Sequence, residues 1–76
     1  MQIVINGSDR SFPSLSASAT IADLVRALDL KGDRVAIEHN GNIVRRQDWP
    51  STPIHSGDKF EVVHFVGGGS GANQLP

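Results

Sequence analysis

The sequence contains no cysteine, and this absence removes several kinds of chemistry at once. None of the 76 residues offers a thiol for a disulfide, a thiolate metal site or a cysteine nucleophile. The seven Lys and Arg residues and eight Asp and Glu residues are dispersed, so no basic stripe is present to neutralise nucleic-acid phosphates. No apolar run approaches the roughly 18 residues of a membrane helix, and the N-terminus lacks the basic and apolar regions of a signal peptide. We therefore expect a cytoplasmic protein with no nucleic-acid or membrane partner.

The turn signals and β-branched segments predict one small α+β domain over residues 1–66, with the order β-β-α-β-β-β. Residues 6–9, Asn-Gly-Ser-Asp, have turn chemistry before a strand at 10–13, and Asn40-Gly41 has the chemistry of a tight type I′ turn. We expect a first hairpin over 2–13, a second over 34–45, a turn or single 3₁₀ turn over 47–53 that places Trp49 at the core edge, and a last strand over 59–66. Two hairpins flanking one helix predict a four- or five-stranded mixed sheet, with the first and last strands parallel at its centre.

One amphipathic helix is expected between the hairpins. Thr20 precedes Asp23 by three residues, which is close to a capping box. Apolar residues then recur with helical spacing at Ile21, Leu24, Val25 and Leu28. We expect about ten helical residues that end near Gly32.

Strand periodicity predicts which side chains face outward. If Ile3, Ile5, Phe60 and Val62 pack against the helix, the alternation of strand side chains turns Val4, Val63 and Phe65 to the other face. Apolar residues on an exposed face beside the C-terminal segment suit a protein interface. Val4, Val63, Phe65 and Gly67 are therefore the predicted partner-binding residues.

A triple glycine, Gly67 to Gly69, directly follows the last predicted strand. Glycine has no Cβ, so such a segment can enter a narrow channel and offer a backbone carboxylate to another enzyme. The same composition is also that of a flexible linker. We expect residues 67–76 to form a flexible tail, in which Ser70 to Pro76 hold the Gly69 carboxyl group in a peptide bond.

The β-β-α-β-β-β order with a glycine ending resembles the β-grasp, or ubiquitin-like, fold. Within that fold, residues 57–69 closely resemble the ending of the ThiS sulfur carriers of thiamine biosynthesis. Residues 1–7, 20–25 and 35–45 are similar to the opening strand, the helix start and the second hairpin of that family. The resemblance covers residues 1–69, and Ser70 to Pro76 depart from it, because family members commonly stop at the glycines.

The resemblance implies a function for the chain end. A ThiF-type enzyme would adenylate the carboxylate of Gly69, or of Gly68, with ATP. The carboxylate would then become a thiocarboxylate that gives its sulfur to a ThiG-type thiazole synthase. The residues after Gly69 would first need removal by a processing protease, so the full-length chain is expected to be an inactive precursor.

The chain itself is expected to be a protein substrate and carrier, not an enzyme. It has no phosphate-binding loop of the G-x-x-x-x-G-K-[ST] type, so ATP belongs to the partner and no cofactor is expected on this chain. His39, His55 and His64 have no ligand-type spacing, and we predict neither a catalytic residue nor a metal site. Two alternatives stay open: a β-grasp interaction module whose glycines are only a linker, and a MoaD-like carrier or ubiquitin-like modifier.

Overall fold

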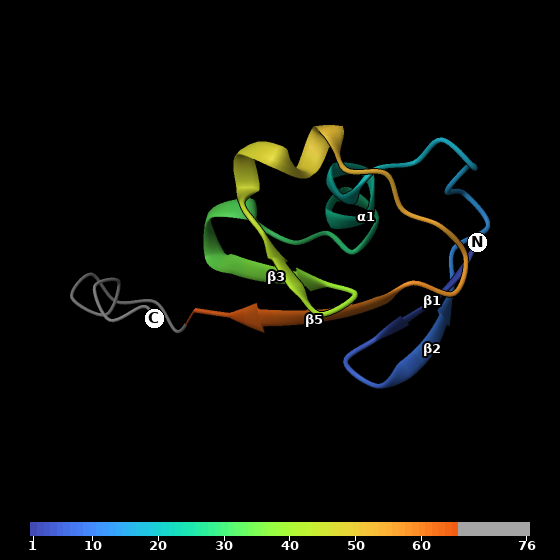
Figure 1. Cartoon of the computed structure of the whole chain (residues 1–76), viewed down its shortest axis with the longest axis horizontal. Helices are drawn as coiled ribbons and strands as arrows, with labels where there is room; N and C mark the ends of the chain where they lie inside the picture. Colours follow the sequence, from blue (N-terminus) through green and yellow to red (C-terminus); the bar gives the residue numbers. More distant parts are fainter. Residues whose placement is uncertain (66–76) are drawn as a thin grey trace.

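The structure, a computed structural model, describes residues 1–65 as a five-stranded mixed sheet with one α-helix (Figure 1). The elements in chain order, with η marking a 3₁₀ helix, are β1 (Gln2–Ile5), β2 (Ser8–Ser11), α1 (Ile21–Ala27), η1 (Gly32–Arg34), β3 (Val35–His39), β4 (Asn42–Val44), η2 (Arg46–Ser51) and β5 (Lys59–His64). The strand order is β2-β1-β5-β3-β4, with β5 parallel to β1 and antiparallel to β3. The predicted sheet, with its first and last strands parallel at the centre, is confirmed.

Both hairpins turn at an Asn-Gly pair. The turn at Asn40-Gly41 is as predicted, whereas Ser8 and Asp9, which were expected in the first turn, begin β2. Asn6 and Gly7 have φ values of 51° and 82°, and Asn40 and Gly41 have values of 49° and 90°. Two consecutive residues with positive φ give the type I′ turn, whose twist matches that of the strands it joins. These turns fix the register of both hairpins.

Helix α1 begins as predicted. The Thr20 amide donates to the Asp23 carboxylate at 2.9 Å, and the Asp23 amide donates to the Thr20 hydroxyl at 3.4 Å. The backbone hydrogen bond from Thr20 is the main reason that the pKa of Asp23 is lowered. Asp23 also forms an ion pair with Arg26 one turn later, so the capping box is connected to the exposed helix surface.

The predicted helix end near Gly32 is wrong. Helix α1 ends at Ala27, and Asp29 takes the left-handed conformation with φ of 57°. The Leu30 amide donates to the Val25 carbonyl at 3.1 Å and the Asp29 amide to the Arg26 carbonyl at 3.0 Å, which is the Schellman pattern. An aspartate therefore occupies the position where a glycine was expected, and its short polar side chain tolerates that conformation.

Gly32 has a packing role instead. A Cβ atom added to it would lie 3.2 Å from the ring of Trp49, closer than a normal contact. Trp49 lies in η2, is 4% exposed, and donates from Nε1 to the Val44 carbonyl at 3.0 Å. The predicted 3₁₀ segment that docks Trp49 is therefore present, although η2 is six residues long.

The core lies between one face of the sheet and α1 with η2. The buried apolar residues are Ile3, Ile5, Phe12, Ala19, Ile21, Leu24, Val25, Val35, Ile37, Trp49, Ile54 and Phe60. Leu28 and Val62 are half-buried and pack against this cluster. Within residues 1–65, no helix has both the length and the apolar composition needed to cross a membrane.

Candidate functional site

The last strand is the central structural feature of the candidate site, because it leads to the glycine run. Figure 1 shows β5 running through the middle of the sheet and ending on the side away from the N-terminus. The regular strand ends at His64, two residues earlier than predicted, although the Phe65 amide still donates to the Arg34 carbonyl at 2.8 Å. Val66, the predicted sulfur-carrying residues Gly68 and Gly69, the predicted contact residue Gly67 and the rest of the tail lie outside the described residues.

Both Asn-Gly turns bind β5 through their asparagine side chains. The Val62 amide donates to Oδ1 of Asn6 at 2.7 Å, and Nδ2 of Asn6 donates to the Val62 carbonyl at 3.3 Å. On the other edge, the Lys59 amide donates to Oδ1 of Asn40 at 2.8 Å. The sequence predicts the two turns from their residue types, but the side-chain bonds to β5 depend on the tertiary arrangement.

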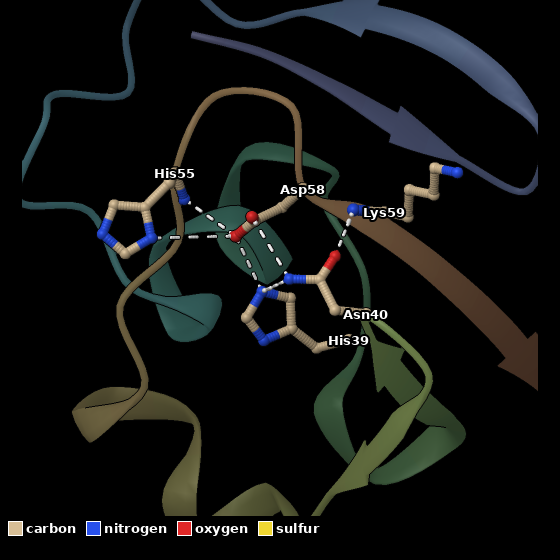
Figure 2. A network of polar contacts seen from close by, with 5 residues as sticks. All are labelled: His39, Asn40, His55, Asp58 and Lys59. Atoms are coloured by element: carbon tan, nitrogen blue, oxygen red, sulfur yellow. Dashed lines mark hydrogen bonds and ion pairs between the residues drawn. The ribbon is translucent and has the colours of Figure 1, made fainter.

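A polar network anchors the start of β5 (Figure 2). Nε2 of His39 lies 2.7 Å from Oδ2 of Asp58, and the His39 ring stacks on Phe60 with centroids 4.7 Å apart. The same carboxylate accepts from the His55 amide at 2.9 Å and from Nδ2 of Asn40 at 3.2 Å. The network connects the turn after β3 to the loop before β5.

The hydrogen bonds in this network also set the charge state of Asp58. Burial acts to raise the pKa of Asp58, but the bonds from His39, the His55 amide and Asn40 more than offset it, so the pKa is lowered. The carboxylate is therefore ionised at neutral pH and accepts from all three donors. Within residues 1–65, no group of His, Asp and Glu side chains is arranged to hold a metal ion.

The face of the sheet opposite the core, here called the outer face, carries Val4 and Val63 of the predicted contact residues, and Phe65 follows the end of β5. Val63 is 58% exposed, whereas Val4 and Phe65 are half-buried. Val4 pairs with Lys59, four residues before Val63, so these two valines are about 13 Å apart along the strand direction. The register thus leaves Val4 at a distance from Val63, whereas Phe65 follows Val63 by two residues in the chain.

Three outer-face residues were not among the predicted ones. Ile43 in β4 is 77% exposed and pairs with Glu38 of β3, which in turn pairs with Glu61 of β5. The pairing of Glu38 with Ile43 could have been predicted from the Asn40-Gly41 turn, because a two-residue turn places these residues opposite each other. The pairing of Glu38 with Glu61 joins distant parts of the chain, and no local pattern predicts it.

The comparisons with known proteins agree with this architecture. The model of the ThiS family matches residues 3–69. The sulfur carrier protein ThiS of Bacillus subtilis is 32% identical over 65 residues, which are 86% of this chain and 96% of that protein. The crystal structure of ThiS from Geobacter metallireducens superposes with a TM-score of 0.77 at 28% identity, covering 90% of this chain and 99% of that one.

A second group of relatives is much longer than this chain. A thiazole synthase of Paramagnetospirillum magneticum is 41% identical over 70 residues, which are 92% of this chain and 21% of that protein. In the thiazole synthase of Magnetococcus marinus the matched part is 20% of the protein. The chain thus spans about a fifth of these two enzymes. The family match over residues 3–69 and the five-stranded sheet with one helix show that the chain belongs to the ThiS family and has its β-grasp fold.

Proposed function

We propose that this chain is a sulfur carrier protein of thiamine biosynthesis, with the carboxylate of Gly69 as the group that carries sulfur. The observation that supports this most strongly is that the family match ends on Gly69, the last residue of the glycine run. Strand β5 lies at the centre of the sheet, between β1 and β3. This position suits a strand whose following residues are presented to an enzyme.

The proposed chemistry takes place on the chain end and not on a side chain. A carboxylate is a poor electrophile, so an oxygen of Gly69 first attacks the α-phosphorus of ATP, which releases pyrophosphate and forms an acyl adenylate. Hydrosulfide supplied by a sulfur donor then attacks the acyl carbon, breaks its bond to the AMP oxygen and leaves a thiocarboxylate and free AMP. ATP binding and catalysis belong to a ThiF-type enzyme, and this chain is its protein substrate. The scheme places the chain in the cytoplasm, where that enzyme and ATP are present.

A ThiG-type thiazole synthase is the proposed acceptor of the sulfur. The match of this chain to a fifth of two proteins named thiazole synthase supports this assignment. Val63 on the outer face, with Phe65 and Gly67, is proposed to contact the ThiF-type enzyme. Val4 is kept as a separate contact, because the register places it beside Lys59.

The residues after Gly69 add a requirement for processing. While Ser70 follows Gly69, no free α-carboxylate exists at that position and adenylation cannot begin. We therefore propose that a protease cleaves after Gly69, or after Gly68, before sulfur is loaded.

The test combines pyrophosphate exchange with intact-mass measurement. The 76-residue chain and a form that ends at Gly69 are each incubated with a ThiF-type enzyme, ATP and a sulfur donor. We expect exchange only with the shorter form, followed by a mass increase equal to the replacement of one oxygen by sulfur. Equal exchange from the 76-residue chain would contradict the precursor proposal. An unchanged mass of the shorter form would contradict the carrier proposal and favour the alternative function, a β-grasp interaction module.

A further inference from the structure

Two glutamates lie opposite each other on the outer face, at the centre of the sheet. In the antiparallel register of β3 and β5, Glu38 pairs with Glu61. Side chains directly opposite in such a pair have Cβ atoms about 5 Å apart, and like charges there are destabilising. Their neighbours Ile37 and Phe60, each 1% exposed, point to the other face and into the core, so both glutamates point away from it.

Neither glutamate has a cationic partner within the described part of the chain. The ion pairs of residues 1–65 involve Asp23, Asp33 and Asp58 only. Lys59 lies on the same face two residues before Glu61, yet it forms no ion pair with either carboxylate. Two carboxylates therefore occupy directly opposite positions on this surface, an arrangement in which like charges are unfavourable.

Exposed apolar side chains lie on both sides of the acidic pair. Ile43 pairs with Glu38 and is 77% exposed, and Val63 follows Glu61 by two residues and is 58% exposed. They are the two large apolar side chains that are exposed within residues 1–65. The half-buried Ala36 pairs with Val63 and lies diagonally next to Ile43, so it connects the two. We call Ile43, Glu38, Glu61, Val63 and Ala36 the outer patch.

The chain end limits which protein can cover this patch. Gly69 follows Val63 by six residues, so the two are at most about 20 Å apart even when the chain is fully extended. A protein that holds the Gly69 end in its active site is therefore also close to the outer patch. This chain matches about a fifth of each of two thiazole synthases. We therefore take a thiazole synthase to be the protein that covers the outer patch.

We propose that the outer patch docks the thiazole synthase through an arginine of that enzyme, which inserts its guanidinium between Glu38 and Glu61. An arginine fits because its planar group can bind two carboxylates while its apolar stem contacts Ile43 and Val63. Binding relieves the repulsion between the glutamates, so the pair that is unfavourable in the free chain becomes favourable in the complex. This inference rests on the proposed carrier function and specifies the chemistry by which one partner recognises the chain.

The test compares two double variants that each remove two negative charges. The patch variant, Glu38→Gln/Glu61→Gln, removes both charges from the outer patch. The control variant, Asp33→Asn/Asp48→Asn, removes two charges from exposed residues outside the patch. Each is made in the chain that ends at Gly69, and its dissociation constant for purified thiazole synthase of the same organism is measured at low and high salt. We expect the patch variant to bind roughly tenfold more weakly and to lose most of the salt dependence. The control should stay within about twofold, since it leaves the patch intact.

Folding and function are checked on the same samples. The urea midpoint of the patch variant should be equal to or above that of the parent, because a repulsion is removed. An unchanged dissociation constant for the synthase would overturn the proposal, whatever happens with the adenylating enzyme, and so would an equal loss in the control. Thiocarboxylate formation is measured separately by mass. If it fails in the parent chain, the carrier function is wrong, whereas normal formation with unchanged synthase binding rejects only the outer patch.

Discussion

The side chain of Asn6 binds the backbone of Val62, 56 residues later, through both its oxygen and its nitrogen. The pairing of β1 with β5 covers only Val4 with Lys59 and Ile5 with Phe60, so the Asn6 side chain extends the contact by two residues along β5, to Val62. Because Asn6 also has positive φ, a single residue both turns the first hairpin and holds the strand that leads to the glycine run.

Substitution of Asn6 should separate these two roles. Asn6→Gly keeps the left-handed backbone and removes the bonds to Val62, so we expect the free energy of unfolding to fall by about 1 kcal/mol. Asn6→Ala removes the same bonds and adds backbone strain, for a further loss of about 1 kcal/mol. Urea denaturation of the parent, the Gly variant and the Ala variant measures both losses of unfolding free energy. Equal stability of the Gly and Ala variants would mean that the left-handed conformation of Asn6 is not maintained.

The Asp58 network should make stability depend on pH in the acid range. The pKa of Asp58 is lowered in the folded chain, so its contribution is complete above its unfolded value near 3.8 and is lost as the pH falls through the lower folded value. Asp58→Asn should lower the free energy of unfolding at pH 7 by about 1 to 3 kcal/mol, because a charged acceptor of several bonds is removed.

The difference between parent and Asp58→Asn should therefore shrink at acid pH. Urea midpoints at neutral pH and below pH 4 measure it, and Asp48→Asn is the control, since Asp48 is exposed and its carboxylate has no hydrogen-bond partner among residues 1–65. A difference that stayed constant across this range would show that ionisation of Asp58 does not contribute.

Neighbouring valines on β5 should respond in opposite ways. Val62 packs against the core, so Val62→Ala should cost roughly 1 to 2 kcal/mol of stability. Val63 is 58% exposed on the outer face, so Val63→Ser should leave stability close to that of the parent while weakening binding to the ThiF-type enzyme. Thermal denaturation and a binding titration distinguish the two effects. Weaker binding from Val62→Ala at unchanged stability would reverse the assignment of the faces.

The last prediction concerns Gly68 in the chain that ends at Gly69. Gly68→Ala adds a Cβ atom next to the reactive end, and we expect it to abolish pyrophosphate exchange because a channel shaped for glycine excludes it. The unfolding midpoint serves as the control and should not change. Exchange at the parent rate would show that the partner does not require glycine at this position.

The sequence by itself determined the elements and their order. Asn-Gly pairs define both hairpins, Thr20 with Asp23 defines the helix start, and the alternation along the last strand predicts that Phe60 faces the core and Val63 does not. These features depend on residues close together in the chain, so local backbone preferences and periodicity are sufficient. The resemblance of the glycine ending to ThiS, confirmed by the family match, was likewise present in one short segment.

The tertiary structure decided the features that join distant residues. It ended helix α1 at Ala27, with Asp29 in the left-handed conformation and Gly32 packed beside Trp49. It also gave the Asn6 and Asn40 side chains bonds to β5 that no nearby residue indicates. It also placed Glu38 opposite Glu61 and separated Val4 from Val63. The reason is physical: strand register across the sheet is set by packing of the whole core, and a shift by one residue would turn every outer-face side chain inward.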